Sequence, residues 1–179
     1  DLAWTLLDLG GLLCRMGELA QARAVFEEQL SLAEEVAALA PEDLRTRRSL
    51  SAGLRNLAEL LLKQDDSDGA AALGQQAFEV ARGLAEETPG EFNTLEDLAK
   101  AHLMLGRCQE ATAALPEAIQ NSQRAVEIFR ELLRRDENSE AAKNDLIQGL
   151  ERMGDLLALQ AEEAGAFEFY SEAFLLCRA

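Results

Sequence analysis

Hydrophobic and polar residues alternate along the chain with the period of an α-helix. At the start of the sequence, Leu2, Leu6, Leu9 and Leu13 follow one another at steps of four, three and four residues. This spacing places the four side chains on one face of a helix with 3.6 residues per turn. A turn-forming stretch at 16–18 separates this segment from a second apolar segment. The pattern therefore predicts a pair of amphipathic helices.

The same pattern returns every 48 residues, without a gap. The four copies begin at Asp1, Ser49, Asp97 and Asp145. A column of small residues in the second half of each copy consists of Ala22, Ala70, Ala118 and Ala166. We therefore predict four helix-turn-helix repeats, at residues 1–48, 49–96, 97–144 and 145–179. They give about eight antiparallel helices of about 15 to 20 residues each.

Short stretches between the copies are expected to end one helix and start the next. The stretches 40–43 and 88–91 each contain a proline, which cannot continue a helix, and 136–139 occupies the corresponding place in the third copy. Acidic and serine side chains in these stretches can cap the helix that follows. Because a helix pair cannot bury its apolar faces alone, neighbouring pairs must stack into an all-α solenoid.

The columns of the repeat resemble the tetratricopeptide repeat. Its pattern of a large residue, Leu-Gly, a second large residue, a small alanine and an aromatic residue is met in the first copy by Leu6, Leu9, Gly10, Leu13, Ala22 and Phe26. The fourth copy meets it at Leu150, Met153, Gly154, Leu157, Ala166 and Tyr170. The usual repeat has about 34 residues, so these copies look like the longer repeats of kinesin light chains and of bacterial multidomain signalling proteins. The resemblance implies a right-handed α-solenoid.

Residues 1–179 are expected to form one repeat domain that belongs to a longer protein. The chain begins on the first apolar turn of a repeat. It ends without the polar capping helix that the end of a solenoid normally needs.

Composition and charge narrow the class of partner. With 48% hydrophobic residues the chain is not disordered, and a net charge of −16 argues against nucleic acid as a partner. No apolar run is long enough to span a membrane, so we predict no membrane association and a cytoplasmic location. The cysteines at 14, 108 and 177 form no CxxC pair, and we expect reduced, mostly buried thiols.

The third repeat carries two polar residues in columns that are leucine elsewhere. His102 stands where the other copies have Leu6, Leu54 and Leu150, and Gln109 stands seven residues later in another leucine column. Residues seven apart lie on nearly the same helix face, so we expect the two side chains to form a half-buried, hydrogen-bonded pair. Cys108 is expected to be buried among apolar side chains.

The sequence carries no constellation for catalysis. It lacks a glycine-rich phosphate loop, a GxSxG elbow, an HExxH motif and a kinase signature. One histidine and three dispersed cysteines cannot supply the three or four convergent ligands of a metal site. We therefore predict that the protein is not an enzyme and holds no cofactor or metal.

The resemblance implies that the first helix of each repeat lines a concave surface, where a partner segment would bind. Transferring the positions of that surface by the Leu-Gly register gives the candidate contact residues Arg55, Asn56, Lys100, Met104, Arg107, Gln148 and Arg152. Four of them are basic within an acidic protein, which suits a peptide or helix with acidic and apolar side chains.

The predicted function is that of a protein-interaction scaffold that binds a protein or peptide segment in this groove. Two alternatives stay open. The chain can be the regulatory arm of a larger multidomain signalling enzyme, such as a protease or a kinase. It can also be a module that associates with itself through the uncapped ends of the solenoid.

Overall fold

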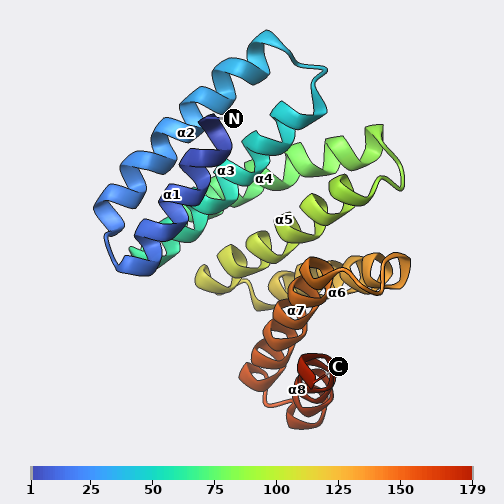
Figure 1. Cartoon of the computed structure of the whole chain (residues 1–179). Helices are drawn as coiled ribbons and strands as arrows, with labels where there is room; N and C mark the ends of the chain where they lie inside the picture. Colours follow the sequence, from blue (N-terminus) through green and yellow to red (C-terminus); the bar gives the residue numbers. More distant parts are fainter. Residues whose placement is uncertain (1, 179) are drawn as a thin grey trace. The chain divides into compact units, whose positions relative to one another are not determined.

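The computed structural model describes residues 2–178, and these residues form eight helices and no strand (Figure 1). In chain order the helices are α1 (Leu2–Met16), α2 (Leu19–Leu39), α3 (Leu44–Lys63), α4 (Ser67–Glu87), α5 (Phe92–Ala111), α6 (Leu115–Arg135), α7 (Glu140–Leu159) and α8 (Glu163–Arg178). The second helices of the four repeats begin 48 residues apart, at Leu19, Ser67, Leu115 and Glu163. The predicted all-α fold of eight helices is confirmed.

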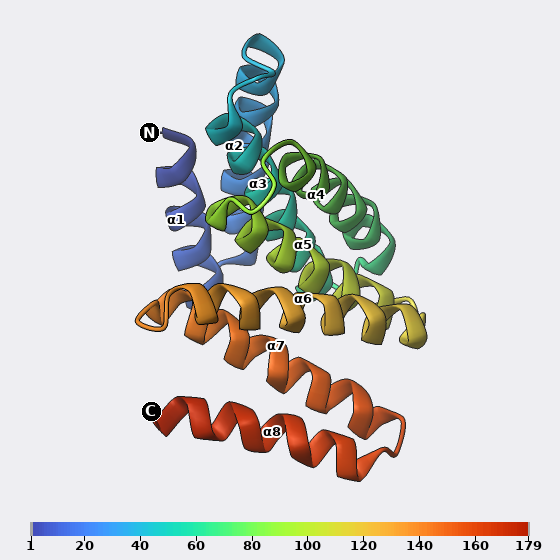
Figure 2. The same ribbon diagram turned by 90° about the vertical axis from the view of Figure 1, so that its right-hand side faces the viewer.

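The chain divides into two compact units, with the boundary between Pro89 and Gly90. The first unit contains α1 to α4, and the second contains α5 to α8. Inside each unit every helix packs against the next one, and the first helices also touch, α1 against α3 and α5 against α7. Figure 2 shows the stacking of α6, α7 and α8 in the second unit. The single domain expected from the sequence stays a prediction.

The turn inside each repeat has the same geometry in all four copies. One residue adopts a positive φ, and these residues are Gly17 (80°), Asp65 (60°), Ala113 (62°) and Ala161 (60°). In the third copy, the Ala114 N–H donates to the Gln109 carbonyl at 2.7 Å, and the Ala113 N–H donates to the Glu110 carbonyl at 2.9 Å. This pair of bonds is the Schellman motif, which satisfies the last carbonyls of a helix.

Replacing Ala113 with glycine is expected to stabilise the protein by about 0.5–1 kcal/mol. A left-handed backbone costs a residue with a Cβ about 1–2 kcal/mol, and the greater freedom of glycine in the unfolded chain offsets part of the gain. Urea unfolding measures the difference. The control is Ala111→Gly, in the last position of α5, which should lose stability. Equal losses in the two variants would contradict the assigned turn.

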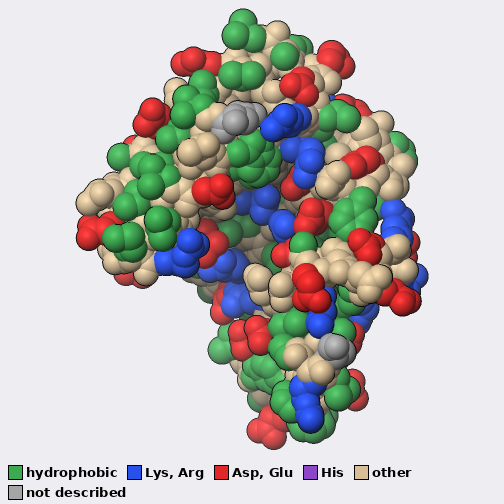
Figure 3. Space-filling model, viewed as in Figure 1, with side chains coloured by type: hydrophobic (Ala, Val, Ile, Leu, Met, Phe, Trp, Pro, Cys, Tyr) green, Lys and Arg blue, Asp and Glu red, His purple; other side chains and the backbone are tan. Residues whose placement is uncertain are grey.

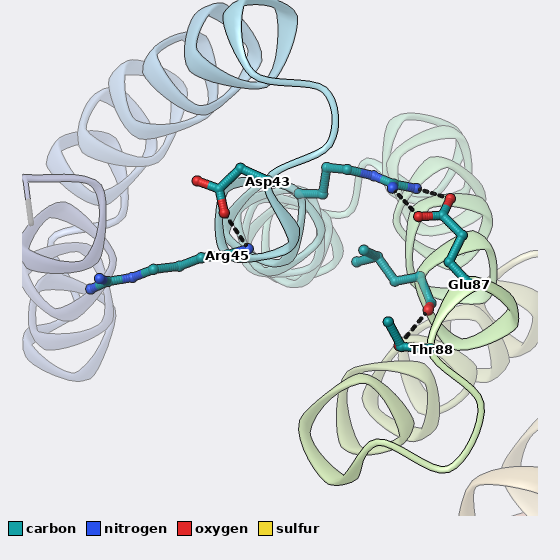
Figure 4. A network of polar contacts seen from close by, with 6 residues as sticks. Asp43, Arg45, Glu87 and Thr88 are labelled. Atoms are coloured by element: carbon teal, nitrogen blue, oxygen red, sulfur yellow. Dashed lines mark hydrogen bonds and ion pairs between the residues drawn. The ribbon is translucent and has the colours of Figure 1, made fainter.

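The predicted caps are present at the starts of α3, α5 and α7. The side chains of Asp43, Glu91 and Ser139 accept hydrogen bonds from the N–H groups of Arg45, Thr94 and Ala142, respectively. Figure 4 shows the Asp43 cap beside a second contact, in which Arg47 Nη2 donates to Glu87 Oε1 at 2.8 Å. This ion pair joins the start of α3 to the end of α4 and lowers the pKa of the Glu87 carboxyl.

Each unit has its own hydrophobic core. Leu7, Phe26 and Leu60 belong to the core of the first unit, and Phe129 and Leu150 belong to that of the second. The alanine column lies where the helices of a pair come closest, since its members are 0%, 0%, 0% and 4% exposed. The glycine of the Leu-Gly pair has the same role, because a Cβ on Gly10 would lie 2.3 Å from Phe26 Cε1.

The three cysteines differ in exposure, and none of them forms a disulfide within residues 2–178. Cys108 is buried as expected, and burial raises the pKa of its thiol to about 11. Cys14 is half-buried and Cys177 is exposed, so the expectation of mostly buried thiols was wrong. Cys177 lies near the end of α8, and its side chain is exposed to solvent. Across residues 2–178, none of the helices combines the length and the apolar character needed to cross a membrane.

Candidate partner-binding face

Five of the seven candidate contact residues lie on the first helices of the second unit. Lys100, Met104 and Arg107 belong to α5, and Gln148 and Arg152 belong to α7. We call the surface formed by Lys100, Arg107, Gln148 and Arg152 with their acidic neighbours the α5–α7 face. The other two candidates, Arg55 and Asn56, are half-buried on α3 of the first unit.

Lys100 occupies one end of the α5–α7 face and is held by two carboxylates. Its Nζ lies 2.9 Å from Glu96 Oε1, one turn earlier on α5, and 3.0 Å from Asp145 Oδ2 on α7. Burial raises the pKa of Asp145, and the nearby Glu96 carboxyl raises it further, while Lys100 lowers it. Carboxylates of the protein itself therefore balance the charge of Lys100. Its main role here is to join α5 to α7.

Arg107 and Arg152 occupy the other end of the α5–α7 face, with like charges close together. Arg152 Nη2 contacts Glu110 Oε2, and the Arg152 side chain is 21% exposed. Burial lowers the pKa of Arg152, and the positive charge of Arg107 lowers it further. Arg152 Nε is buried and has no hydrogen-bond partner. The nearby Asp155 carboxylate acts in the opposite direction and raises the pKa of Arg152, so positive and negative groups are mixed on this part of the face.

Of the remaining two candidates on these helices, one has the exposure expected from the sequence and the other does not. Gln148 is exposed, as a groove contact requires. Met104 is only 5% exposed, so it lies beneath the face and supports it instead of presenting its side chain to a partner. The transfer from the family assumed that the side chain at each repeat position points toward the partner. In this protein the packing between helices buries the Met104 side chain instead.

His102 and Gln109 belong to one polar network, but they do not meet directly. His102 Nδ1 lies 2.7 Å from Asn121 Oδ1, and Asn121 Nδ2 donates to Gln109 Oε1 at 2.8 Å. Because an amide oxygen only accepts, the imidazole donates through Nδ1. Asn121, on the second helix α6, therefore satisfies both residues of the predicted pair. The sequence signal that we missed was a polar residue at position 121, where the second repeat has Leu73.

Replacing His102 with leucine is expected to stabilise the protein more at pH 5.5 than at pH 8. Burial lowers the pKa of His102 and is the largest cause; the hydrogen bond with Asn121 raises it, Arg124 on α6 lowers it, and the net shift is downward. The unfolded chain therefore binds the proton more readily than the folded chain, so folding stability falls as the pH drops below about 6.5. Melting temperatures of both proteins at the two pH values measure the effect. An equal gain at both pH values would contradict it.

The acidic partners on the α5–α7 face were not identified from the sequence. Glu96, Glu110 and Asp145 each contact one of the predicted basic residues. Lys100 with Asp145 and Arg152 with Glu110 join residues of consecutive first helices, slightly less than one repeat apart in the sequence. A search for opposite charges at that separation would have found both pairs.

No metal site accompanies this face. Within residues 2–178, no group of three or more His, Cys, Asp or Glu side chains is arranged to hold a metal ion. The charged and polar side chains of the α5–α7 face are of the kinds that form ion pairs and hydrogen bonds.

Comparison with known proteins identifies the family. Residues 2–37 and residues 49–124 match models described as Tetratricopeptide repeat, and together they cover more than half of the chain. The chain belongs to the tetratricopeptide repeat family. The resemblance seen in the sequence is thus confirmed. Tetratricopeptide repeats generally act as interaction scaffolds. No curated protein sequence matches the chain.

Solved structures share this tetratricopeptide repeat fold at low sequence identity. The chain is similar to BtubC (BKLC) from P. vanneervenii, with a TM-score of 0.69 and 18% identity over 99% of this chain and 63% of BtubC. It is also similar to the apo form of RapI, with a TM-score of 0.66 and 14% identity over 98% of this chain and 42% of RapI. The chain thus spans less than two thirds of either protein, and the similarity extends to the fold alone.

Proposed function

We propose that this tetratricopeptide repeat protein binds an acidic segment of another protein on the α5–α7 face. The observation that supports the proposal is the pair of half-buried guanidinium groups of Arg107 and Arg152. Two partly desolvated positive charges repel each other, and the charge of Arg107 lowers the pKa of Arg152. A carboxylate from a partner would lie beside the accessible parts of the two guanidinium groups and reduce the repulsion between them; the Arg152 side chain is 21% exposed.

The partner's chemistry follows from the surroundings of these arginines. Arginine binds carboxylates through two parallel hydrogen bonds, and Gln148 offers an exposed amide on the same face. The protein as a whole carries a net charge of −16, so a broadly acidic partner would be repelled by the rest of the surface. We therefore expect a short acidic stretch with apolar neighbours, presented by an otherwise neutral or basic protein.

A lysate experiment with matched variants tests the proposal. The test variant carries Arg107→Gln and Arg152→Gln, and the control carries Arg124→Gln and Arg134→Gln on α6, where the side chains are 62% and 72% exposed. Both variants lose two positive charges. We expect the control to retain at least one bound protein that the test variant loses, with affinity reduced on the order of tenfold or more.

Identical sets of bound proteins for the test and control variants would contradict the α5–α7 face as the site. Melting temperatures must first be compared, because Arg152 is half-buried. If the double variant is less stable, Arg107→Gln alone replaces it, since Arg152 then keeps its contact with Glu110. Loss of binding by that single variant would support the proposal, and unchanged binding would contradict it.

Self-association is a second candidate function, supported by exposed apolar side chains on α1 and α8. Leu9 is 44% exposed, whereas the residues of the same column, Leu57, Leu105 and Met153, are 3–8% exposed. On α8, Phe174 is 59% exposed, whereas Val126 in the same column is 1% exposed. Figure 3 shows hydrophobic side chains at the surface where α8 lies, in the lower part of the view.

Sedimentation over a range of concentrations tests this second candidate. Association through these surfaces predicts a mass that rises with concentration and that falls back to the monomer in Phe174→Glu. A constant monomer mass would exclude it. The regulatory arm of a larger signalling enzyme and the cytoplasmic location are not addressed by either experiment and stay predictions.

A further inference from the structure

Two exposed surfaces of the molecule correspond to surfaces that are buried where its repeats stack. Inside each unit the second helix of one repeat packs against the first helix of the next, α2 against α3 and α6 against α7. Figure 2 shows α8, the second helix of the fourth repeat, with α7 on one side. We call the exposed residues Phe167, Phe174 and Cys177 the α8 surface and the exposed residues Thr5, Leu9 and Met16 the α1 surface.

A contact between the first two repeats shows which apolar residues of these surfaces would meet. Arg23 Nη1 on α2 donates to Gln64 Oε1 at the end of α3, at 3.3 Å. Phe167 occupies the position of Arg23 in the fourth repeat, and Met16 occupies the position of Gln64 in the first. The two residues are 71% and 64% exposed. A polar pair between repeats inside the protein thus corresponds to an apolar pair between two copies of it.

An ion pair between the last two repeats shows that charges would match as well. Arg130 Nη2 on α6 lies 2.6 Å from Glu172 Oε2 on α8. Arg178 occupies the position of Arg130 in the fourth repeat, and Glu28 occupies the position of Glu172 in the first. Both residues are exposed. The same stacking between two copies would therefore place opposite charges beside each other.

The contact between two copies would be looser than its counterpart inside the protein. Val126 Cγ2 on α6 lies 3.0 Å from the place where a Cβ on Gly149 of α7 would be. The corresponding residues are Phe174 and Thr5, and both are larger. The two helices would thus lie further apart than α6 and α7, and we expect weaker association than the packing within a unit.

We propose that copies of this protein associate head to tail, with α8 of one copy against α1 of the next. This inference rests on self-association, the second candidate function, and assigns the two surfaces that meet. Contact between Phe167 and Met16 would remove apolar surface from water, and Arg178 would form an ion pair with Glu28. Because the two surfaces differ, each copy keeps one of them available for a further copy.

A mixture of two blocked variants tests the head-to-tail arrangement. Leu9→Glu places a charge on the α1 surface, and Phe174→Glu places one on the α8 surface; the two positions are 44% and 59% exposed. Each variant alone should sediment as a monomer, since each lacks one of the two surfaces that must meet. Their equimolar mixture should sediment as a dimer, in which α8 of the Leu9→Glu protein contacts α1 of the Phe174→Glu protein.

The outcomes separate this proposal from self-association in general. A mixture that stays monomeric, while the wild-type protein associates, would overturn the head-to-tail arrangement and leave self-association standing. A dimer formed by either variant alone would also overturn it, because a contact between like surfaces would then be present. A wild-type protein that stays monomeric would overturn both proposals.

Chemical crosslinking gives an independent test, because the exposed Cys177 already lies on the α8 surface. In the second unit, Phe129 Cδ2 lies 3.6 Å from the place where a Cβ on Gly149 would be. Cys177 and Thr5 occupy these positions in the fourth and first repeats. In Thr5→Cys, a head-to-tail contact would therefore place two thiols within reach of bismaleimidoethane, which joins thiols through a short linker.

The control for Thr5→Cys is Ala72→Cys, at an exposed position on α4. Covalent dimers are isolated, and peptide mass spectrometry identifies the two joined cysteines. We expect the link between position 5 and Cys177 to exceed the link between position 72 and Cys177 on the order of tenfold or more, because contact raises the effective concentration of the two thiols. Equal yields of the two links would overturn the proposal.

Discussion

Replacing Phe129 with alanine is expected to lower the free energy of unfolding by about 3–5 kcal/mol. Phe129 lies on α6, is 0% exposed and belongs to the core of the second unit. A Cβ on Gly149 would lie 3.6 Å from Phe129 Cδ2, so the backbone of α7 passes close to the ring. Two rigid helices cannot easily close the space that the ring leaves, and the variant therefore retains a cavity.

Chemical unfolding followed by circular dichroism measures the effect of Phe129→Ala. The matched control is Phe167→Ala on α8 of the same unit, where the phenyl ring is 71% exposed. That change should alter the stability by no more than about 0.5 kcal/mol. Similar losses in both variants would show that the core of the second unit is packed differently from this structure.

Replacing Ala22 with leucine is expected to cost about 1–3 kcal/mol through overpacking. Ala22 is 0% exposed and belongs to the alanine column that the sequence singled out. In the third repeat, the corresponding Ala118 has its carbonyl oxygen 3.1 Å from the place where a Cβ on Gly106 would lie. Small residues on both helices thus allow the backbones to approach, and a larger side chain has no space.

The control for Ala22→Leu is Ala24→Leu, two residues further along α2 and exposed. Leucine and alanine have similar helix propensities, so the control should leave the free energy of unfolding almost unchanged. An Ala22→Leu protein with the same free energy of unfolding as the wild type would contradict the interpretation that the alanine column allows close helix packing.

The fold follows from sequence patterns that are local or strictly repeated. Leucine spacing predicted the helices, and residues such as Asp43 and Ser139 marked where α3 and α7 begin. Ala113 and Ala161 give no hint of a positive φ by themselves, but Gly17 in the same column of the first repeat does. A regular repeat therefore transfers information from the clearest copy to the others.

The candidate site could be predicted from the sequence less fully than the fold, because it depends on contacts between side chains of different helices. The register placed Arg107 and Arg152 on first helices, but it did not show that Glu110 lies beside Arg152. It also placed Met104 on the same surface, although packing buries that side chain. The position of a residue in the repeat predicts the face of the helix on which it lies. Its contacts depend in addition on the direction and length of its side chain.

Nuclear magnetic resonance of the arginine side chains tests the central claim most directly. The Nε–H signals are assigned with the arginine-to-glutamine variants and are followed as the partner recovered from the lysate is added. We predict that the signals of Arg107 and Arg152 move, while those of Arg124 and Arg134 on α6 stay in place. Movement of the α6 signals with no change at Arg107 and Arg152 would contradict binding on the α5–α7 face.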